Sequence, residues 1–251
     1  MLKDISLDAE HSLHHVFLHR CISIDLEMNP DTRKIFDVAL VPGGESAHVV
    51  RCGSVNDACV SALLEAEDRG CFLLGHNLIH HDLVQLKAAD ERLARIGQAP
   101  IDTLWLNPLA FPQNPYQKLV KHYQDGRLQA AHRNDPELDA RLVFEVLTNQ
   151  LAALTGLASR APDLMAAYHW LTTRLPASGG VDAVFRLCRK AGVPDRAEAQ
   201  AAIRATLGPD VCPTRLEDVL RDLAPEQSWP LAYAMAWISA CACPRRSNMC
   251  G

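Results

Sequence analysis

Two acidic side chains stand two residues apart in an otherwise apolar segment near the start of the chain. The segment Cys21–Glu27 reads Cys-Ile-Ser-Ile-Asp-Leu-Glu, and its alternate apolar residues predict a buried strand. Because side chains alternate along a strand, the carboxylates of Asp25 and Glu27 project from the same face. Like charges held that close repel each other unless a cation lies between them. The pair therefore indicates a cation site or, alternatively, an edge strand whose polar face meets water.

A third acidic residue, Asp82, follows a second buried segment. The run Cys71–Gly75 predicts a short strand, the chain turns at His76 and Asn77, and Asp82 falls on the helix that comes next. Asp is also favourable near any helix N-terminus. A plain turn followed by a solvated first helical turn is therefore the competing interpretation.

A fourth acidic residue, Asp139, lies in the first turns of a later predicted helix. Asp135 and Pro136 are typical of a helix start, because Asp caps the free N–H groups and Pro suits the first turn. Ala140 is small and allows close packing beside Asp139. Asp135 is an alternative ligand, and a solvated helix face is the interpretation without function.

The elements that must position these residues form an α/β pattern. Strands are predicted at residues 21–27, 35–41, 48–51, 71–75 and 100–105, with helices at 55–68, 80–96, 116–123 and 135–154 and a loop at 107–115. From about residue 155 strand signals vanish, and helices are predicted at 162–175, 181–191, 196–207 and 216–223. The sequence thus predicts a mixed sheet flanked by helices in a domain at 1–155, and an all-helical extension at 156–251.

Composition narrows the class of protein. The chain has 251 residues, of which 48% are hydrophobic and 22% charged, which is ordinary for a globular protein. Its formal net charge of -5 differs from the strong positive charge of proteins that bind nucleic acid over their whole surface. Its nine cysteines are odd in number and scattered, which favours reduced, buried thiols in a cytoplasmic protein. The apolar stretch Trp229–Cys243 is too short to span a bilayer, so no membrane role is expected.

Taken in order, the three acidic segments resemble the DEDD (DnaQ-like) superfamily of 3′–5′ exonucleases. The motifs are Asp-x-Glu in a strand, Gly-His-Asn-x₄-Asp, and Asp-Ala in a helix, and they cover roughly residues 21–151. The resemblance implies a ribonuclease H-like fold that holds two divalent ions, Mg²⁺ or Mn²⁺, with Asp25, Glu27, Asp82 and Asp139. Asp102 falls in a strand segment that is common in the superfamily but supplies none of its metal ligands.

A closer resemblance is to the exonuclease-like domain at the N-terminus of certain bacterial RecQ-type helicase proteins. It rests on the segments Leu106–Pro112, Asn114–Tyr116, Leu119–Tyr123, Asn134–Pro136 and Asp139–Leu142. The sequence contains no Gly-x₄-Gly-Lys-Ser/Thr phosphate loop, so this chain holds no helicase motor. A helicase or another protein is accordingly a candidate partner.

The chain departs from the superfamily at the general base. One branch has a histidine five positions before the last aspartate and another a tyrosine four before it, whereas here Asn134 and Asp135 occupy those positions. His132 is the candidate base if its loop delivers it to the site. It could equally be an exposed loop residue, and His122 is a weaker substitute.

The resemblance implies hydrolysis of terminal phosphodiesters at the 3′ ends of nucleic acid, with single-stranded DNA expected ahead of RNA. Substrate contacts are expected from the turn residues His76 and Asn77 and from the basic residues Lys118, Lys121 and Arg133. The alternative function, motivated by the missing histidine, is a catalytically weakened module that binds nucleic-acid ends or a protein partner.

Overall fold

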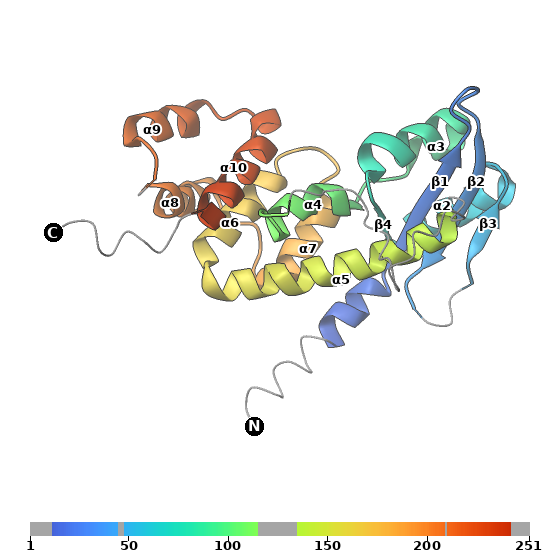
Figure 1. Cartoon of the computed structure of the whole chain (residues 1–251), viewed down its shortest axis with the longest axis horizontal. Helices are drawn as coiled ribbons and strands as arrows, with labels where there is room; N and C mark the ends of the chain where they lie inside the picture. The colour runs from blue at the N-terminus through green and yellow to red at the C-terminus, as the bar shows by residue number, and fades with distance from the viewer. Residues whose placement is uncertain (1–11, 45–47, 115–134, 209, 242–251) are drawn as a thin grey trace. The chain divides into compact units, whose positions relative to one another are not determined.

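The computed structural model describes residues 12–44, 48–114, 135–208 and 210–241, which form two compact units (Figure 1). The first unit takes Met1–Trp105 and Lys118–Gln150, and the second takes Leu106–Gln117 and Leu151–Gly251. The division falls inside helix α5 (Pro136–Arg160). The boundary that the sequence predicts between residues 155 and 156 also falls inside this helix.

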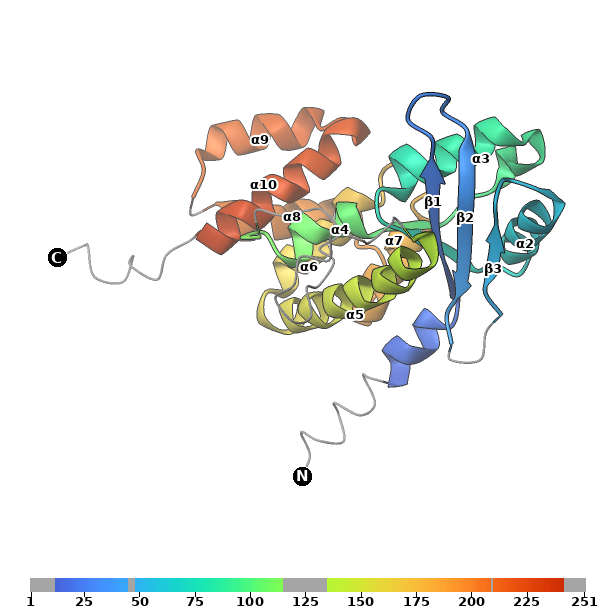
Figure 2. The same ribbon diagram turned by 45° about the vertical axis from the view of Figure 1, so that its right-hand side comes forward.

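A five-stranded mixed sheet is the centre of the first unit. Its strands are β1 (Cys21–Met28), β2 (Ile35–Pro42), β3 (Val50–Cys52), β4 (Phe72–Gly75) and β5 (Pro100–Asp102). Their order is β3-β2-β1-β4-β5, with β2 antiparallel to both β1 and β3 and with β4 parallel to both β1 and β5. Figure 2 shows β1, β2 and β3 side by side, with helix α2 (Asp57–Asp68) beyond β3. The predicted α/β class with a mixed sheet flanked by helices is confirmed.

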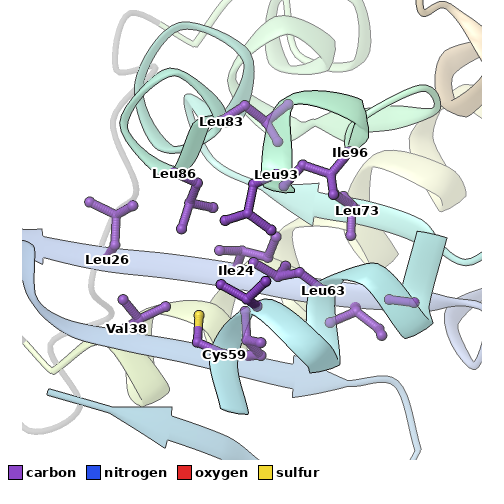
Figure 3. Close-up of a cluster of buried hydrophobic side chains, with 14 of the residues drawn as sticks. Ile24, Leu26, Val38, Cys59, Leu63, Leu73, Leu83, Leu86, Leu93 and Ile96 are labelled. Carbon is purple, nitrogen blue, oxygen red and sulfur yellow. The ribbon is translucent and has the colours of Figure 1, made fainter. Parts of the chain in front are cut away.

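One face of the sheet forms the hydrophobic core of this unit. Ile22, Ile24 and Leu26 alternate along β1 and are 7%, 0% and 5% exposed. They pack against side chains of α2 and of helix α3 (Leu83–Ala89), and Figure 3 shows Ile24 close to Leu63 of α2. The alternation leaves the intervening residues of β1, among them the two acidic ones, on the opposite face.

The single helix predicted at residues 80–96 is wrong. The structure has a π-helical turn η1 (Leu78–Asp82), then α3, then a 3₁₀ helix η2 (Glu91–Arg95). Asp90 has extended backbone at the end of α3, and its side chain accepts a hydrogen bond of 2.9 Å from the backbone N–H of Arg92. Asp competes with helical hydrogen bonding in this way, which explains the break.

The predicted strand at residues 100–105 is too long. It ends at Asp102, and helix α4 (Thr103–Ala110) follows, taking residues that the sequence assigns to the 107–115 loop. Pro108 lies inside this helix and removes one of its hydrogen bonds. Leu106 and Leu109 are 2% and 1% exposed, and burial of about 1.5–3 kcal/mol per side chain offsets that loss. The short helix predicted at residues 116–123 lies outside the described residues.

Helices make up the described part of the second unit. They are the end of α4, the end of α5, α6 (Pro162–Thr172), α7 (Gly179–Arg189), α8 (Arg196–Leu207), α9 (Pro213–Asp222), η3 (Pro225–Gln227) and α10 (Ser228–Cys241). Helices α6 to α9 confirm the four helices that the sequence predicts, and α10 takes the apolar run from Trp229 as far as Cys241, where the described residues end. Helix α6 contacts α7, α8 and α10 and is the centre of this unit.

Helix α5 is longer than the sequence predicts, because it continues past residue 154 to Arg160. By length and composition alone it could cross a membrane, a test that core helices of soluble proteins also pass. Its apolar stripe is buried within the protein: Ala140, Val143, Leu147, Leu151 and Leu154 are each 0–1% exposed. These five residues form one buried side of α5, while 28% of the most apolar window of the helix is buried in all.

A buried imidazole network joins α6 to α7. His169 is 0% exposed, and its Nε2 lies 2.8 Å from a carboxylate oxygen of Asp182. Its Nδ1 lies 2.6 Å from a guanidinium nitrogen of Arg189. Because Arg can only donate, Nδ1 accepts and Nε2 carries the proton. His169 is therefore held as a neutral ring, and burial lowers its pKa, as does the charge of Arg189, against the opposing effect of Asp182.

We expect this network to stabilise the fold less as the pH falls below the pKa of an ordinary histidine. The unfolded chain takes up a proton near pH 6.5, whereas folded His169, with its lowered pKa, does not. Its stabilisation is therefore complete above pH 6.5 and declines as the pH drops through that value. Between pH 7.5 and 5.5 the melting midpoint of the wild type should fall several degrees further than that of His169→Gln. The size follows because ~1 kcal/mol corresponds to about 2–4 °C in a chain of this size. Equal slopes by circular dichroism would contradict this.

The described cysteines are free thiols, and four of them, Cys21, Cys52, Cys59 and Cys188, are buried. Burial raises the pKa of Cys21 and of Cys59 to about 12. These thiols stay protonated and inert in the folded state. The expectation of buried thiols holds for these four, whereas Cys212 and Cys241 are exposed.

Candidate metal centre

Three of the four predicted metal ligands come together in the first unit. Asp25 and Glu27 of β1 and Asp139 of α5 each offer a carboxylate oxygen, and these oxygens lie within 4.8 Å of one another. All three residues are partly buried. We call them the acid cluster. The structure thus brings together the pair on β1 and the aspartate beside Ala140, and their role as metal ligands stays a prediction.

The strand register fixes the pair on β1. Asp25 lies opposite Ala39 of β2, and Glu27 lies opposite Asp37. Residues directly opposite each other on antiparallel strands share a face of the sheet. Glu27 therefore has a second carboxylate as its cross-strand neighbour, which adds to the negative charge of this face.

The start of α5 fixes the third member. The side chain of Asp135 accepts a hydrogen bond of 3.1 Å from the backbone N–H of Glu137, and its carbonyl accepts one of 3.0 Å from the backbone N–H of Asp139. Asp135 thus begins the helix as the sequence predicts. The acid cluster contains Asp139 and not the alternative ligand Asp135.

Asp82 is not a member of the acid cluster. It is 3% exposed, and one carboxylate oxygen lies 2.7 Å from Nδ1 of His81. Burial raises the pKa of Asp82, against the opposing effect of the hydrogen bond from His81. In the described structure Asp82 is therefore buried and paired with the imidazole of His81. The role of Asp82 as a fourth metal ligand stays a prediction.

His81 is a residue that the sequence does not single out. Its side chain is 43% exposed, and its hydrogen bond to Asp82 is the largest of the effects that raise its pKa. The negative charges of Asp82, Asp25 and Glu27 add to this increase, whereas partial burial opposes it. The imidazole is therefore electrostatically coupled to the acid cluster. The only signal in the sequence is its place next to Asp82.

The turn after β4 is held by a buried carboxylate. Asp102, 4% exposed at the end of β5, accepts three backbone hydrogen bonds, from Asn77 at 2.9 Å, from Ile79 at 3.0 Å and from Leu104 at 3.0 Å. Asn77 has φ 70°, in the left-handed region that Asn tolerates better than most residues. The adjacent His76 has its Nδ1 2.9 Å from the hydroxyl of Thr103.

These contacts give His76 and Asn77 a part in shaping the turn that leads to Asp82. Their predicted contact with substrate stays a prediction. The other predicted substrate and base residues, Lys118, Lys121, Arg133 and His132, lie outside the described residues, as do His122 and Asn134.

The donor set of the acid cluster suits a hard divalent cation. Three carboxylates this close repel one another, and a cation between them removes that repulsion. Mg²⁺ and Mn²⁺ prefer oxygen ligands, and Mg²⁺ commonly uses one or two carboxylates together with water and substrate phosphate. The residues present therefore fit the ions that the sequence resemblance implies.

Comparison of the chain with family models, with curated proteins and with solved structures finds no match.

Proposed function

We propose that this chain is a divalent-metal-dependent 3′–5′ exonuclease, with the acid cluster as its active site. The observation that carries the proposal is the convergence of Asp25, Glu27 and Asp139 from a strand and a helix far apart in the sequence. The mixed sheet also supports the ribonuclease H-like fold that the resemblance implies, with the second unit as a helical extension.

Asp25, Glu27 and Asp139 would hold Mg²⁺ or Mn²⁺, with Asp82 as the proposed fourth ligand of a two-ion site. Ions bound there would lower the pKa of a water molecule and stabilise charge on the phosphate and the leaving oxygen. The residues of the chain supply the rest. The carboxylate oxygens of Asp25, Glu27 and Asp139 lie within 4.8 Å of one another, and the hydrogen bond between His81 and Asp82 holds the proposed fourth ligand in its buried position.

The proposed substrate is the 3′ end of nucleic acid, single-stranded DNA ahead of RNA. A helicase or another protein is a proposed partner, and the cytoplasm is the proposed compartment. A second candidate function is a weakened module that binds nucleic-acid ends. One observation favours it. Asp135 occupies the position where one branch of the superfamily has its catalytic tyrosine, and here it accepts hydrogen bonds from the backbone of the first turn of α5.

The test is hydrolysis of single-stranded DNA labelled separately at each end, with Mn²⁺ or Mg²⁺ and with EDTA. A 3′ label should be released at once as a mononucleotide, whereas a 5′ label should appear in a ladder of shortening strands. EDTA should abolish both signals, and Asp25→Ala should lower the rate at least about 1000-fold, because it removes electrostatic stabilisation of the reacting phosphate.

Two outcomes separate the candidates. No metal-dependent release, or release that Asp25→Ala leaves unchanged, would overturn the exonuclease proposal. Tight binding of 3′ ends without turnover would favour the weakened module. Release from the 5′ label first would overturn the direction of hydrolysis that we propose.

A further inference from the structure

Arg51, in the middle of β3, connects the sheet to the start of α5. Its Nε and Nη2 donate to the two carboxylate oxygens of Asp37 at 3.2 Å and 2.7 Å. Its Nη1 lies 3.0 Å from a carboxylate oxygen of Asp135. One guanidinium therefore bridges two carboxylates that belong to different elements.

The strand register places Arg51 on the same face as the acid cluster. Arg51 lies opposite Ala39 on β2, Ala39 lies opposite Asp25 on β1, and Asp37 lies opposite Glu27. A bare Asp37 carboxylate would repel Glu27 directly, since like charges opposite each other in a sheet are destabilising. The two-pronged bond from Arg51 neutralises Asp37 and turns it toward β3.

The second arm of Arg51 holds the residue that begins α5. Asp135 is one helical turn before Asp139, and its carbonyl accepts the hydrogen bond from the Asp139 N–H. A helix end is the part of a helix that frays most easily. A bond from β3 to Asp135 therefore restrains the same turn that carries the third carboxylate of the acid cluster.

We propose that Arg51 is the positioning residue of the acid cluster: it holds the first turn of α5 against the sheet so that Asp139 meets Asp25 and Glu27. The metal-binding role of this arrangement rests on the proposed function, whereas the contacts that Arg51 makes with Asp37 and Asp135 do not. Arg suits this role because its planar fork offers donors in several directions at once, whereas Lys offers a single ammonium.

The expected effect on overall stability is small. The side chain of Arg51 is 43% exposed, and those of Asp37 and Asp135 are 20% and 34% exposed. Exposed ion pairs stabilise a fold little. A positioning role therefore predicts a local change at α5 with the rest of the chain intact.

The test compares Arg51→Met with a matched control, Arg95→Met, in the full chain. Arg95 makes a similar two-pronged contact, at 2.6 Å and 3.1 Å, with Asp68, outside the acid cluster. Two quantities are measured: Mn²⁺ affinity in the absence of nucleic acid, by electron paramagnetic resonance, and amide hydrogen exchange of the peptide that covers the start of α5.

Arg51→Met should weaken Mn²⁺ binding about 10- to 100-fold, the range typical for residues that orient metal ligands. It should also speed exchange at the start of α5. Arg51→Lys should restore part of both, and Arg95→Met should change neither. The direction of the change in Mn²⁺ affinity distinguishes a positioning role from a purely electrostatic one, because the latter predicts tighter Mn²⁺ binding once a positive charge is removed.

The inference is overturned if exchange at the start of α5 is unchanged in Arg51→Met, or if the wild type binds Mn²⁺ and Arg51→Met binds it equally or more tightly. Failure of the proposed function has a different signature: the wild type itself would bind Mn²⁺ no better than Asp25→Ala. The exchange measurement then still decides whether Arg51 holds α5, because it requires no metal.

Discussion

Replacing Asp139 with asparagine should lower the rate of 3′-terminal hydrolysis at least about 1000-fold, or ~4 kcal/mol of transition-state stabilisation. Asn keeps the shape of Asp and one acceptor oxygen but removes the negative charge. The acid cluster would then present two charges to a divalent ion in place of three. The measurement is single-turnover release of a 3′ label at saturating Mn²⁺.

The same substitution should leave the metal-free protein folded, because Asn keeps the shape of Asp. Thermal unfolding of the metal-free variant checks this. Glu145→Gln is the matched control, since Glu145 is an exposed carboxylate on the same helix and outside the acid cluster. A wild-type rate in Asp139→Asn, or an equal loss in Glu145→Gln, would count against the site.

Replacing Asp102 with alanine should cost about 3–5 kcal/mol of unfolding free energy, the largest stability effect that we expect. The carboxylate is buried, and three backbone N–H groups donate to it. Hydrogen bonds to a charged group contribute roughly 1.5–3 kcal/mol each, and donors left buried without an acceptor add a penalty. Urea unfolding at neutral pH measures the loss.

Asp102→Asn should be intermediate, because an amide oxygen can still accept from Asn77 and Leu104, whereas the amide nitrogen cannot accept from Ile79. Asp68→Ala is the contrast: it removes an exposed pair with Arg95, which contributes at most about 1 kcal/mol. If Asp102→Ala lost no more than Asp68→Ala, the turn that leads to Asp82 would not depend on this carboxylate.

Much of the sheet and of the acid cluster is predictable from local pattern. Alternation along β1 puts Asp25 and Glu27 on one face and Ile24 in the core, and the structure confirms both. The prediction that Asp139 lies in the first turns of a helix is also confirmed. In each case the information lies within a few residues of the feature that it specifies.

The features that the sequence does not predict depend on contacts between distant residues or on competition within a turn. Arg51 and Asp135 are on different elements, and no local period connects them. The break at Asp90 depends on its side chain capping the next turn, and α4 forms despite Pro108 because its leucines are buried. His81 acquires its coupling to the acid cluster only once β1 and η1 are folded together.

The alternation along β1 also bears on how this chain avoids folding incorrectly. Slipping the strand by one residue would exchange its two faces, sending Ile24 and Leu26 to the polar side and both carboxylates into the apolar layer beneath α2. Two buried, unpaired charges would make that misaligned sheet far less stable than the native one. The residues that we assign to chemistry therefore also keep the strand in register during folding, before any ion or nucleic acid arrives.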